Sequence, residues 1–210
     1  MSRKCLVVDL DKCIGCHACE VACKTEHDIA LGVKWNFVPQ VGPMGTFPNL
    51  SQYWLPLQCQ QCENAPCIEV CPTGASYRSE DGVVLIDQET YIGCQLCMDA
   101  CPYKVRSYDD TLNVVQKCTL CKELTDQGEK PACVAVCCGN ARFFGDLDDP
   151  ESDVSQALAA AGEENIHSLT DVGNTPVTRY ILSKKIADWQ EFSTLAPMSD
   201  SVNSPWMPMV

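Results

Sequence analysis

Short apolar runs alternate with dense clusters of cysteine along roughly the first 148 residues, and this pattern defines the elements that the sequence predicts. Runs rich in valine, isoleucine and aromatic residues, bounded by turn-forming residues, are typical of short strands. Since the first four runs each precede a cysteine cluster, the chain reads as one small unit repeated: strand, cysteine loop and short helix. The predicted strands are CLVVDL (5–10), YWLPL (53–57), VVLID (83–87), NVV (113–115) and ARFFGDL (141–147).

Two further features lie within this region. Strands near 75–78 and 83–87 are expected to form a hairpin, because the sequence between them, Glu-Asp-Gly at 80–82, favours a turn. Residues 24–58 are a long insertion between the first two cysteine clusters, rich in proline, glycine and aromatic residues. We expect an ordered irregular loop there, since long loops are usually functional or disordered.

The region after residue 148 contains no cysteine and changes to helical signals. Asp149 is expected to cap a helix, with Pro150 at its first position and Gly162 as its stop. A weaker helix is expected over about 181–192. Residues 201–210 show no periodicity and are expected either to fray or to lie against a partner.

The cysteine clusters carry the candidate chemistry, because 17 of the 210 residues are cysteine and 15 of these fall into four groups. The third group has Tyr91 where the bacterial ferredoxin run C-x2-C-x2-C-x3-C-P has its first cysteine. Cys5 and Cys138 lie outside the groups. The groups are Cys13, Cys16, Cys19 and Cys23; Cys59, Cys62, Cys67 and Cys71; Cys94, Cys97 and Cys101; and Cys118, Cys121, Cys133 and Cys137.

Iron–sulfur clusters explain this spacing best, since cysteines separated by two residues let successive thiolates point around one cubane. Pro72 and Pro102 follow their groups as the ferredoxin run requires, whereas Lys24 and Cys138 stand in that place in the other two. Structural zinc remains an alternative because pairs of C-x2-C could be sorted into four-ligand sites, although four such runs oversupply zinc. Disulfides are a further alternative, opposed by the odd count and the tight local spacing.

Charge and hydropathy exclude other partners. The net charge of −13 disfavours nucleic acid binding. No apolar run approaches the roughly 20 residues needed to span a bilayer, and the first ten residues show no signal sequence. We therefore expect a soluble protein that reaches a membrane only through a partner. No residue set suggests acid–base or nucleophilic catalysis, and His17, His27 and His167 have no partner pattern.

At this point the four groups resemble the four-cluster iron–sulfur subunits of the molybdopterin oxidoreductase family, the electron-transfer partners of dimethyl sulfoxide, polysulfide and nitrate reductases. The motifs that carry the resemblance cover about residues 1–148, in the family's order. They are VDLDKCIGCHACEVACK, CENAPCIEVCPTGA, DGVVLID, CMDACPYKVRSY and QKCTLCKEL followed by KPACVAVC. A narrower similarity, to the small subunits of pyrogallol transhydroxylase and catechol dehydroxylase-type enzymes, comes from the insertion and the weakened third group.

The resemblance implies an α+β fold of two interleaved ferredoxin-like modules. One module would contain residues 1–58 and 111–148 with groups one and four, the other 59–110 with groups two and three, and 149–210 would be a C-terminal extension. The implied ligand sets are Cys13, Cys16, Cys19 and Cys137; Cys118, Cys121, Cys133 and Cys23; Cys59, Cys62, Cys67 and Cys101; and Cys94, Cys97 and Cys71 with Tyr91 as a candidate fourth ligand.

Three [4Fe–4S] clusters and one altered cluster are therefore expected. The altered site could hold a [3Fe–4S] cluster, a [4Fe–4S] cluster whose unique iron binds Tyr91, water or another group, or nothing.

The function implied is one-electron relay between a donor and a molybdopterin catalytic subunit of reductase or dehydroxylase type, as in anaerobic respiration. The donor would be a membrane quinone-reactive subunit or a soluble protein. The alternatives are a freestanding polyferredoxin shuttle and, as an enzyme, a site-differentiated iron acting as a Lewis acid. The compartment stays open: cytoplasmic, or exported with a signal-bearing partner and membrane-associated through it.

Overall fold

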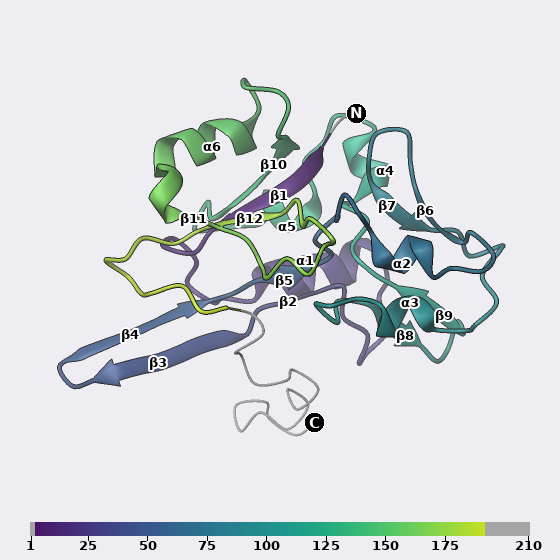
Figure 1. Ribbon diagram of the computed structural model, residues 1–210, viewed down its shortest axis with the longest axis horizontal. Coiled ribbons are helices and arrows are strands. Elements are labelled where there is room, and N and C mark those ends of the chain that lie inside the picture. The colour runs from purple at the N-terminus through teal and green to yellow at the C-terminus, as the bar shows by residue number, and fades with distance from the viewer. Residues whose placement is uncertain (1–2, 192–210) are drawn as a thin grey trace.

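A four-stranded sheet joins the beginning and the end of the described chain in the computed structural model, which describes residues 3–191 (Figure 1). The central strand β1 (Lys4–Asp9) pairs antiparallel with β10 (Arg142–Asp146) and parallel with β12 (Arg179–Ile181). Strand β11 (Ile166–His167) pairs antiparallel with β12 at the edge. Since β1 has neighbours on both sides and packing on both faces, its residues from Cys5 to Asp9 are buried.

Helix α6 (Asp153–Ala161) covers one face of this sheet, where Val154 packs with Cys5 and Val7. Its cap is Ser152, whose Oγ accepts a hydrogen bond from the Ser155 N–H at 3.3 Å. The prediction that Asp149 caps the helix is therefore wrong. The Asp149 carboxylate instead accepts from the backbone of the turn that precedes the helix. The prediction that Gly162 ends it is confirmed, with a φ of 81°.

Four two-stranded sheets complete the strands. The predicted hairpin is confirmed as β6–β7, and the predicted strand at 53–57 divides at Pro56 into β4 and β5. The pairs are β2 (Asn36–Phe37) with β5 (Leu57–Gln58), β3 (Gln40–Thr46) with β4 (Asn49–Trp54), β6 (Ser76–Arg78) with β7 (Val84–Ile86), and β8 (Ser107–Asp109) with β9 (Val114–Gln116).

The insertion was predicted to be an irregular loop, and this is wrong because β3 and β4 form a long hairpin that protrudes from the body (Figure 1). Proline and glycine obscured the strands in the sequence. Pro43 lies where the pairing of β3 with β4 is irregular, between Val41 and Met44, and a bulge is one of the places where a strand accepts proline. Phe47 and Pro48 form its tip, and Phe47 is 88% exposed.

Short helices follow or interrupt the cysteine loops. Helix α1 (Ala18–Glu26) packs against α5 (Ala132–Ala135), and α2 (Pro66–Glu69) packs against α3 (Leu96–Asp99). Helix α4 (Lys122–Thr125) follows the loop of group four. The residues before α1, α3 and α4 all have positive φ, which turns each loop sharply before the helix begins.

The Asp81 carboxylate, in the β6–β7 turn, ties three of these elements together. Its Oδ2 lies 2.7 Å from Lys4 Nζ and 2.9 Å from Lys122 Nζ. Burial opposes ionisation of Asp81, but hydrogen bonds from Lys4, Ser79 and Lys122 outweigh it and hold the pKa of this carboxyl well below its usual range.

The segment from β11 to β12, which we call the strap (residues 168–178), runs across the body and hydrogen-bonds to the loop of group two. Glu63 N–H donates to Thr175 O at 2.9 Å, and Val177 N–H donates to Gln60 O at 3.0 Å. The predicted helix over about 181–192 is wrong within the described residues. Ile181 ends a strand, a turn follows at 184–186, and Trp189 stacks on His167 with ring centroids 4.9 Å apart. Residues 192 and 201–210 lie outside the described residues.

Ile181 is thus used in strand pairing, and the apolar residues after it, Leu182, Ala187 and Trp189, pack in the core rather than along one helical face. No helix within residues 3–191 combines the length and the apolar character that a membrane crossing needs.

Candidate metal centres

Three cavities are each lined by four cysteines from two different groups. Their empty volumes are similar, at about 380, 330 and 350 Å³, with part of each open to solvent, which suits three occupants of the same kind. Cavity one is lined by Cys13, Cys16, Cys19 and Cys137; cavity two by Cys23, Cys118, Cys121 and Cys133; and cavity three by Cys59, Cys62, Cys67 and Cys101. These are the sets that the resemblance implies.

Cavity one depends on the tight loop between Cys13 and α1. Gly15 has a φ of 65°, and a Cβ built on it would lie 2.1 Å from the indole of Trp54. Only glycine therefore allows Trp54 to pack against this loop. Cys16 is exposed at the mouth, and its sulfur lies 3.9 Å from that of Cys138, which is also exposed and does not line the cavity.

The cysteines of cavity two are the most buried of the three sets, since all four are buried. His27 Nε2 lies 3.2 Å from Cys121 Sγ, and Trp35 stacks on the imidazole at 4.6 Å. Burial lowers the pKa of His27 and so favours the neutral ring. Nothing in the sequence indicated this partner, because His27 and Cys121 are 94 residues apart.

Cavity three receives a hydrogen bond from the strap. Asn174, which is 2% exposed, donates from Nδ2 to Cys62 Sγ at 3.0 Å and to Tyr103 Oη at 2.8 Å. Sequence analysis missed Asn174 because it lies in the cysteine-free region, far from group two along the chain. Burial raises the pKa of Cys62 to about 12, although this hydrogen bond opposes the rise.

The altered third group places Tyr91 beside Cys94 and Cys97. The Tyr91 hydroxyl is buried, and the backbone N–H of Val115 interacts with it. Burial, and then repulsion by the thiolates of Cys97 and Cys94, raise the pKa of this phenol. Cys71 differs from the other thiols: burial is outweighed by hydrogen bonds, among them one from Ser76 N–H at 3.3 Å, so its pKa is lowered.

The cavities follow one another in the order one, two, three. Cys133 of cavity two lies near enough to Cys19 of cavity one for their ionised forms to repel each other. Cys118 of cavity two has the same relation to Cys59 of cavity three. These four thiols belong to one apolar core cluster with Leu6, Val38, Val83 and Leu120. The core of the protein is therefore built around its thiols.

The altered site of the third group follows cavity three in this order. The guanidinium of Arg106 joins the two sites, because it interacts with thiols of cavity three and with Cys97. Among the cysteines of the four sets, only Cys16 and Cys94 are exposed. The row of thiol sites is thus fully buried at cavity two, half-buried in part at cavity three through Cys62 and Cys67, and open at its two ends.

Burial raises the pKa of most of these thiols, to about 12 for Cys23 and Cys121. Thiols bind metal as thiolates, so the ionised form needs positive charge close by. Arg142 lines cavities one and two, and Arg106 lines cavity three. Sequence analysis missed both arginines, although a signal exists: each stands five residues after the last cysteine of its group, at Cys137 and Cys101.

The geometry separates the three chemical alternatives. All 17 cysteines lie within the described residues and are free thiols, so no disulfide is formed. Within residues 3–191, no three Cys, His, Asp or Glu side chains converge on a point as a single metal ion requires. Tetrahedral zinc binds sulfur at about 2.3 Å and needs such convergence. Four thiols spread around a cavity, with a buried guanidinium Nη1 left without an oxygen or nitrogen partner beside them, instead fit an anionic polynuclear cluster.

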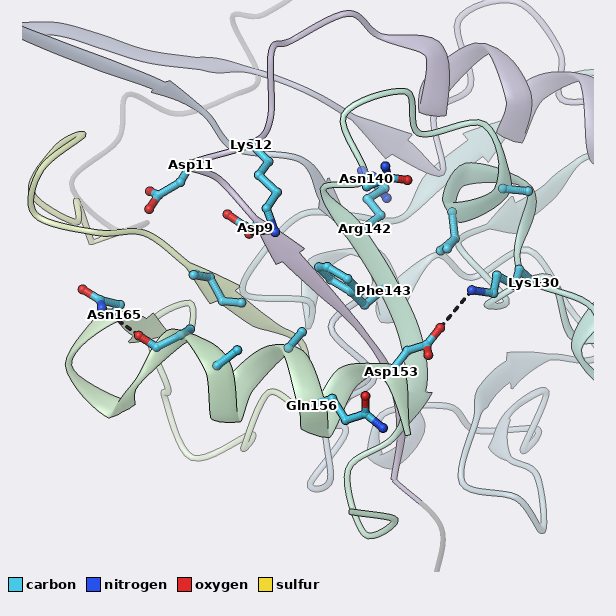
Figure 2. Close-up of a pocket in the computed structure, with 16 residues that line it drawn as sticks. Asp9, Asp11, Lys12, Lys130, Asn140, Arg142, Phe143, Asp153, Gln156 and Asn165 are labelled. Atoms are coloured by element: carbon cyan, nitrogen blue, oxygen red, sulfur yellow. Dashed lines mark hydrogen bonds and ion pairs between the residues drawn. The ribbon is translucent and has the colours of Figure 1, made fainter. Parts of the chain in front are cut away.

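A larger cavity, with an empty volume of about 1620 Å³ that is partly open to solvent, lies beside α6 (Figure 2). None of the residues that line it is a cysteine, and Lys130 closes one side through an ion pair with Asp153 at 2.9 Å. Its acidic and basic side chains are equal in number, so it offers no net charge to a ligand.

Comparison with known proteins places these centres in context. The chain matches the 4Fe-4S dicluster domain families twice, over residues 5–72 and over residues 50–147. A protein named as a dimethyl sulfoxide reductase iron–sulfur subunit, from Halobacterium salinarum, is 40% identical, and the alignment covers 84% of this chain and 78% of that protein.

Two further relatives carry names of the same kind. A sulfite dehydrogenase subunit of Allochromatium vinosum is 38% identical, over 88% of this chain and 85% of its own length. A polysulfide reductase chain of Wolinella succinogenes is 42% identical, over 74% of this chain and 82% of its own length.

Proposed function

Because the protein belongs to the iron–sulfur subunits of the dimethyl sulfoxide reductase and molybdopterin oxidoreductase family, we propose that it relays single electrons between a donor and a molybdopterin catalytic subunit. One observation carries this proposal. The thiol sites form a row that is buried in the middle, and its two exposed cysteines, Cys16 and Cys94, lie at opposite ends. Bound iron–sulfur clusters supply one-electron redox chemistry, and the residues around them hold and bury them and tune their potentials.

Each of the three cavities would hold one [4Fe–4S] cluster on the four cysteines that line it. The fourth site would use Cys71, Cys94 and Cys97, with the Tyr91 hydroxyl as the nearest oxygen in place of a fourth thiolate. The burial of this hydroxyl beside Cys94 and Cys97 supports this choice. A [3Fe–4S] cluster and a [4Fe–4S] cluster with one non-thiolate ligand both fit three thiolates.

The sites would be organised as two interleaved modules, residues 1–58 with 111–148 and residues 59–110, with 149–210 as the extension. The packing of α1 on α5 and of α2 on α3 supports this arrangement, because each pair brings two cysteine groups together. The strap adds hydrogen bonds from the extension to group two.

A docked subunit is favoured over a freestanding shuttle by the β3–β4 hairpin. From residue 35 to residue 62 the sequence has no charged residue, although charged residues make up 20% of the whole protein. Phe47 at the tip is exposed, as is Leu50 at 55%. Depletion of charge and enrichment of aromatic residues are typical of the cores of protein interfaces. The base of the hairpin, Trp54, lies on Gly15 at cavity one, so the catalytic subunit would meet that end.

The donor would then approach the end at Cys94, either as a membrane quinone-reactive subunit or as a soluble protein. The narrower similarity to pyrogallol transhydroxylase and catechol dehydroxylase-type enzymes rests on the insertion and on Tyr91, and it stays a prediction about the substrate of the catalytic partner.

Anaerobic purification from the native cells, without dissociating complexes, tests the proposal. We expect a brown complex that contains a large molybdopterin subunit and molybdenum or tungsten. A second preparation carries Phe47→Asp, and a matched control carries Val172→Asp, which changes an exposed valine of the strap. The Phe47 variant should recover at least tenfold less catalytic subunit, and the control should recover a normal amount.

Two results would contradict the proposal in different ways. A brown protein that purifies alone, without molybdenum or tungsten, would support the freestanding shuttle. An unchanged yield of catalytic subunit with Phe47→Asp would remove the hairpin from the interface and leave the relay in place.

A further inference from the structure

Two buried arginines occupy matching positions in the two halves of the site. Arg142 and Arg106 are each 5% exposed, and each stands five residues after the last cysteine of its group. Each uses Nη2 to donate a hydrogen bond at 2.9 Å to a polar side chain, Asn36 Oδ1 for Arg142 and Ser76 Oγ for Arg106. In both, Nη1 is buried and has no oxygen or nitrogen partner among the described residues, while a thiol lies within hydrogen-bonding reach of each guanidinium, Cys133 for Arg142 and Cys67 for Arg106.

Neither guanidinium has a carboxylate as its counter-ion within residues 3–191, since no ion pair forms at either arginine. A buried charge without a partner costs several kcal/mol, so both arginines need negative charge close by. The groups that face them are thiols. Arg142 lies beside Cys133 and Cys19, and Arg106 lies beside Cys67, Cys59, Cys97 and Cys101.

The position of each arginine spans two neighbouring sites. Arg142 lines both cavity one and cavity two. Arg106 lines cavity three and also lies near Cys97 of the altered site. One positive charge therefore lies between the members of each pair of sites, and the orphaned Nη1 is available to donate to cluster or ligand sulfur.

We propose that Arg142 and Arg106 are shared counter-ions: Arg142 raises the reduction potentials of the clusters in cavities one and two together, and Arg106 those of cavity three and the altered site. The row of four sites is thereby divided into two electrostatic pairs. Reduction adds one negative charge to a site, and a fixed guanidinium stabilises the reduced form more than the oxidised form. The inference rests on the proposed function, because it needs clusters in the cavities.

Reduction potentials measured by redox titration with electron paramagnetic resonance test this role, using the full chain reconstituted or purified with its clusters. Arg142→Gln should shift the reduced-to-oxidised ratio at cavities one and two about tenfold toward the oxidised form, which is about 59 mV for a one-electron couple. The other two potentials should stay unchanged. Arg106→Gln should give the complementary result. Cys16→Ser and Cys94→Ser assign the signals of the two end sites.

Three further variants keep the test decisive. Arg142→Lys and Arg106→Lys retain the charge, so each should shift its own pair of potentials by less than the glutamine variant does. Arg179→Gln removes a partly buried arginine that donates only to backbone carbonyls of the strap, and it should leave all four potentials unchanged. If a glutamine variant fails to bind its clusters, the lysine variant still tests whether the shift is confined to one pair.

A shift of one potential alone, an equal shift of all four, or a lysine variant that behaves like glutamine would overturn the inference. Absence of iron and acid-labile sulfide from the wild-type protein would instead overturn the proposed function. The two failures are therefore distinguishable.

Discussion

Replacing Asn174 with leucine removes the hydrogen bond from the strap to Cys62 while keeping the side-chain size nearly constant. A hydrogen bond to a charged acceptor contributes roughly 1.5–3 kcal/mol, and only the part that grows when the cluster gains an electron changes its potential. If about a third of that energy is the difference between the reduced and the oxidised cluster, the reduced form loses roughly 0.5–1 kcal/mol of stabilisation relative to the oxidised form. This corresponds to a fall of about 20–40 mV for a one-electron couple.

The assay is a redox titration of the site in cavity three, followed by its paramagnetic signal. The matched control is Asn64→Leu, because the hydrogen bonds of Asn64 Nδ2 go to the strap, at Gly173 O and Thr175 Oγ1, and not to a sulfur. Asn64→Leu should leave the potential unchanged even if it lowers the melting temperature. An equal fall in both variants would refute the reasoning, since loosening of the strap and not the bond to sulfur would then be the cause.

The other predictions concern ligand identity, backbone conformation and charge. Tyr91→Cys supplies a fourth thiolate, so the oxidised protein should lose any [3Fe–4S]-type signal and gain about one iron per chain; a wild-type protein without that signal would exclude [3Fe–4S]. Gly15→Ala should lower the free energy of unfolding by about 2 kcal/mol more than Gly74→Ala, measured by denaturant titration. Both glycines have positive φ, but only the former meets Trp54, and equal losses would contradict the clash. Asp81→Asn should cost about 1 kcal/mol at pH 7, because the folded carboxyl has a lowered pKa and its stabilisation is fully present above the unfolded pKa of about 4. The difference in free energy of unfolding between wild type and variant should narrow as the pH falls through the folded pKa of Asp81. The same difference in urea titrations at pH 7 and at pH 3 would contradict this prediction.

Local signals made much of the fold predictable. Strand β1, the β6–β7 hairpin and the end of α6 at Gly162 each depend on residues that are adjacent in sequence. The hairpin of the insertion was missed because proline and glycine usually mark loops. A strand accepts these residues only at a sheet edge or where its pairing is irregular, and the sequence does not show either feature. The helix expected near 181–192 failed because its apolar residues pack on the sheet and on His167.

The same distinction explains the site. Cysteine spacing within a group is local, and the structure brings together, around three cavities, the cysteines that the family resemblance groups. That these cysteines bind clusters stays a prediction. The contacts of His27 and Asn174 with sulfur join segments about 100 residues apart, so no local pattern predicts them. The two buried arginines are intermediate in how well the sequence predicts them. Each lies five residues after a cysteine, Cys101 or Cys137, and this repeated spacing could have identified them without a structure.

The strap connects stability to redox function, because it is part of the fold and of the wall around a thiol at once. Strand β12 lies between β1 and β11 in the main sheet, and Leu169 of the strap packs with Tyr180 of β12 in the core cluster that contains Cys101. The same segment continues to cavity three, where Asn174 donates to Cys62. A protein that lost the strap would therefore lose both core packing and a hydrogen bond to sulfur at cavity three. Since hydrogen bonds to ligand sulfur raise cluster potentials, we expect the strap to raise the potential of a cluster bound in cavity three.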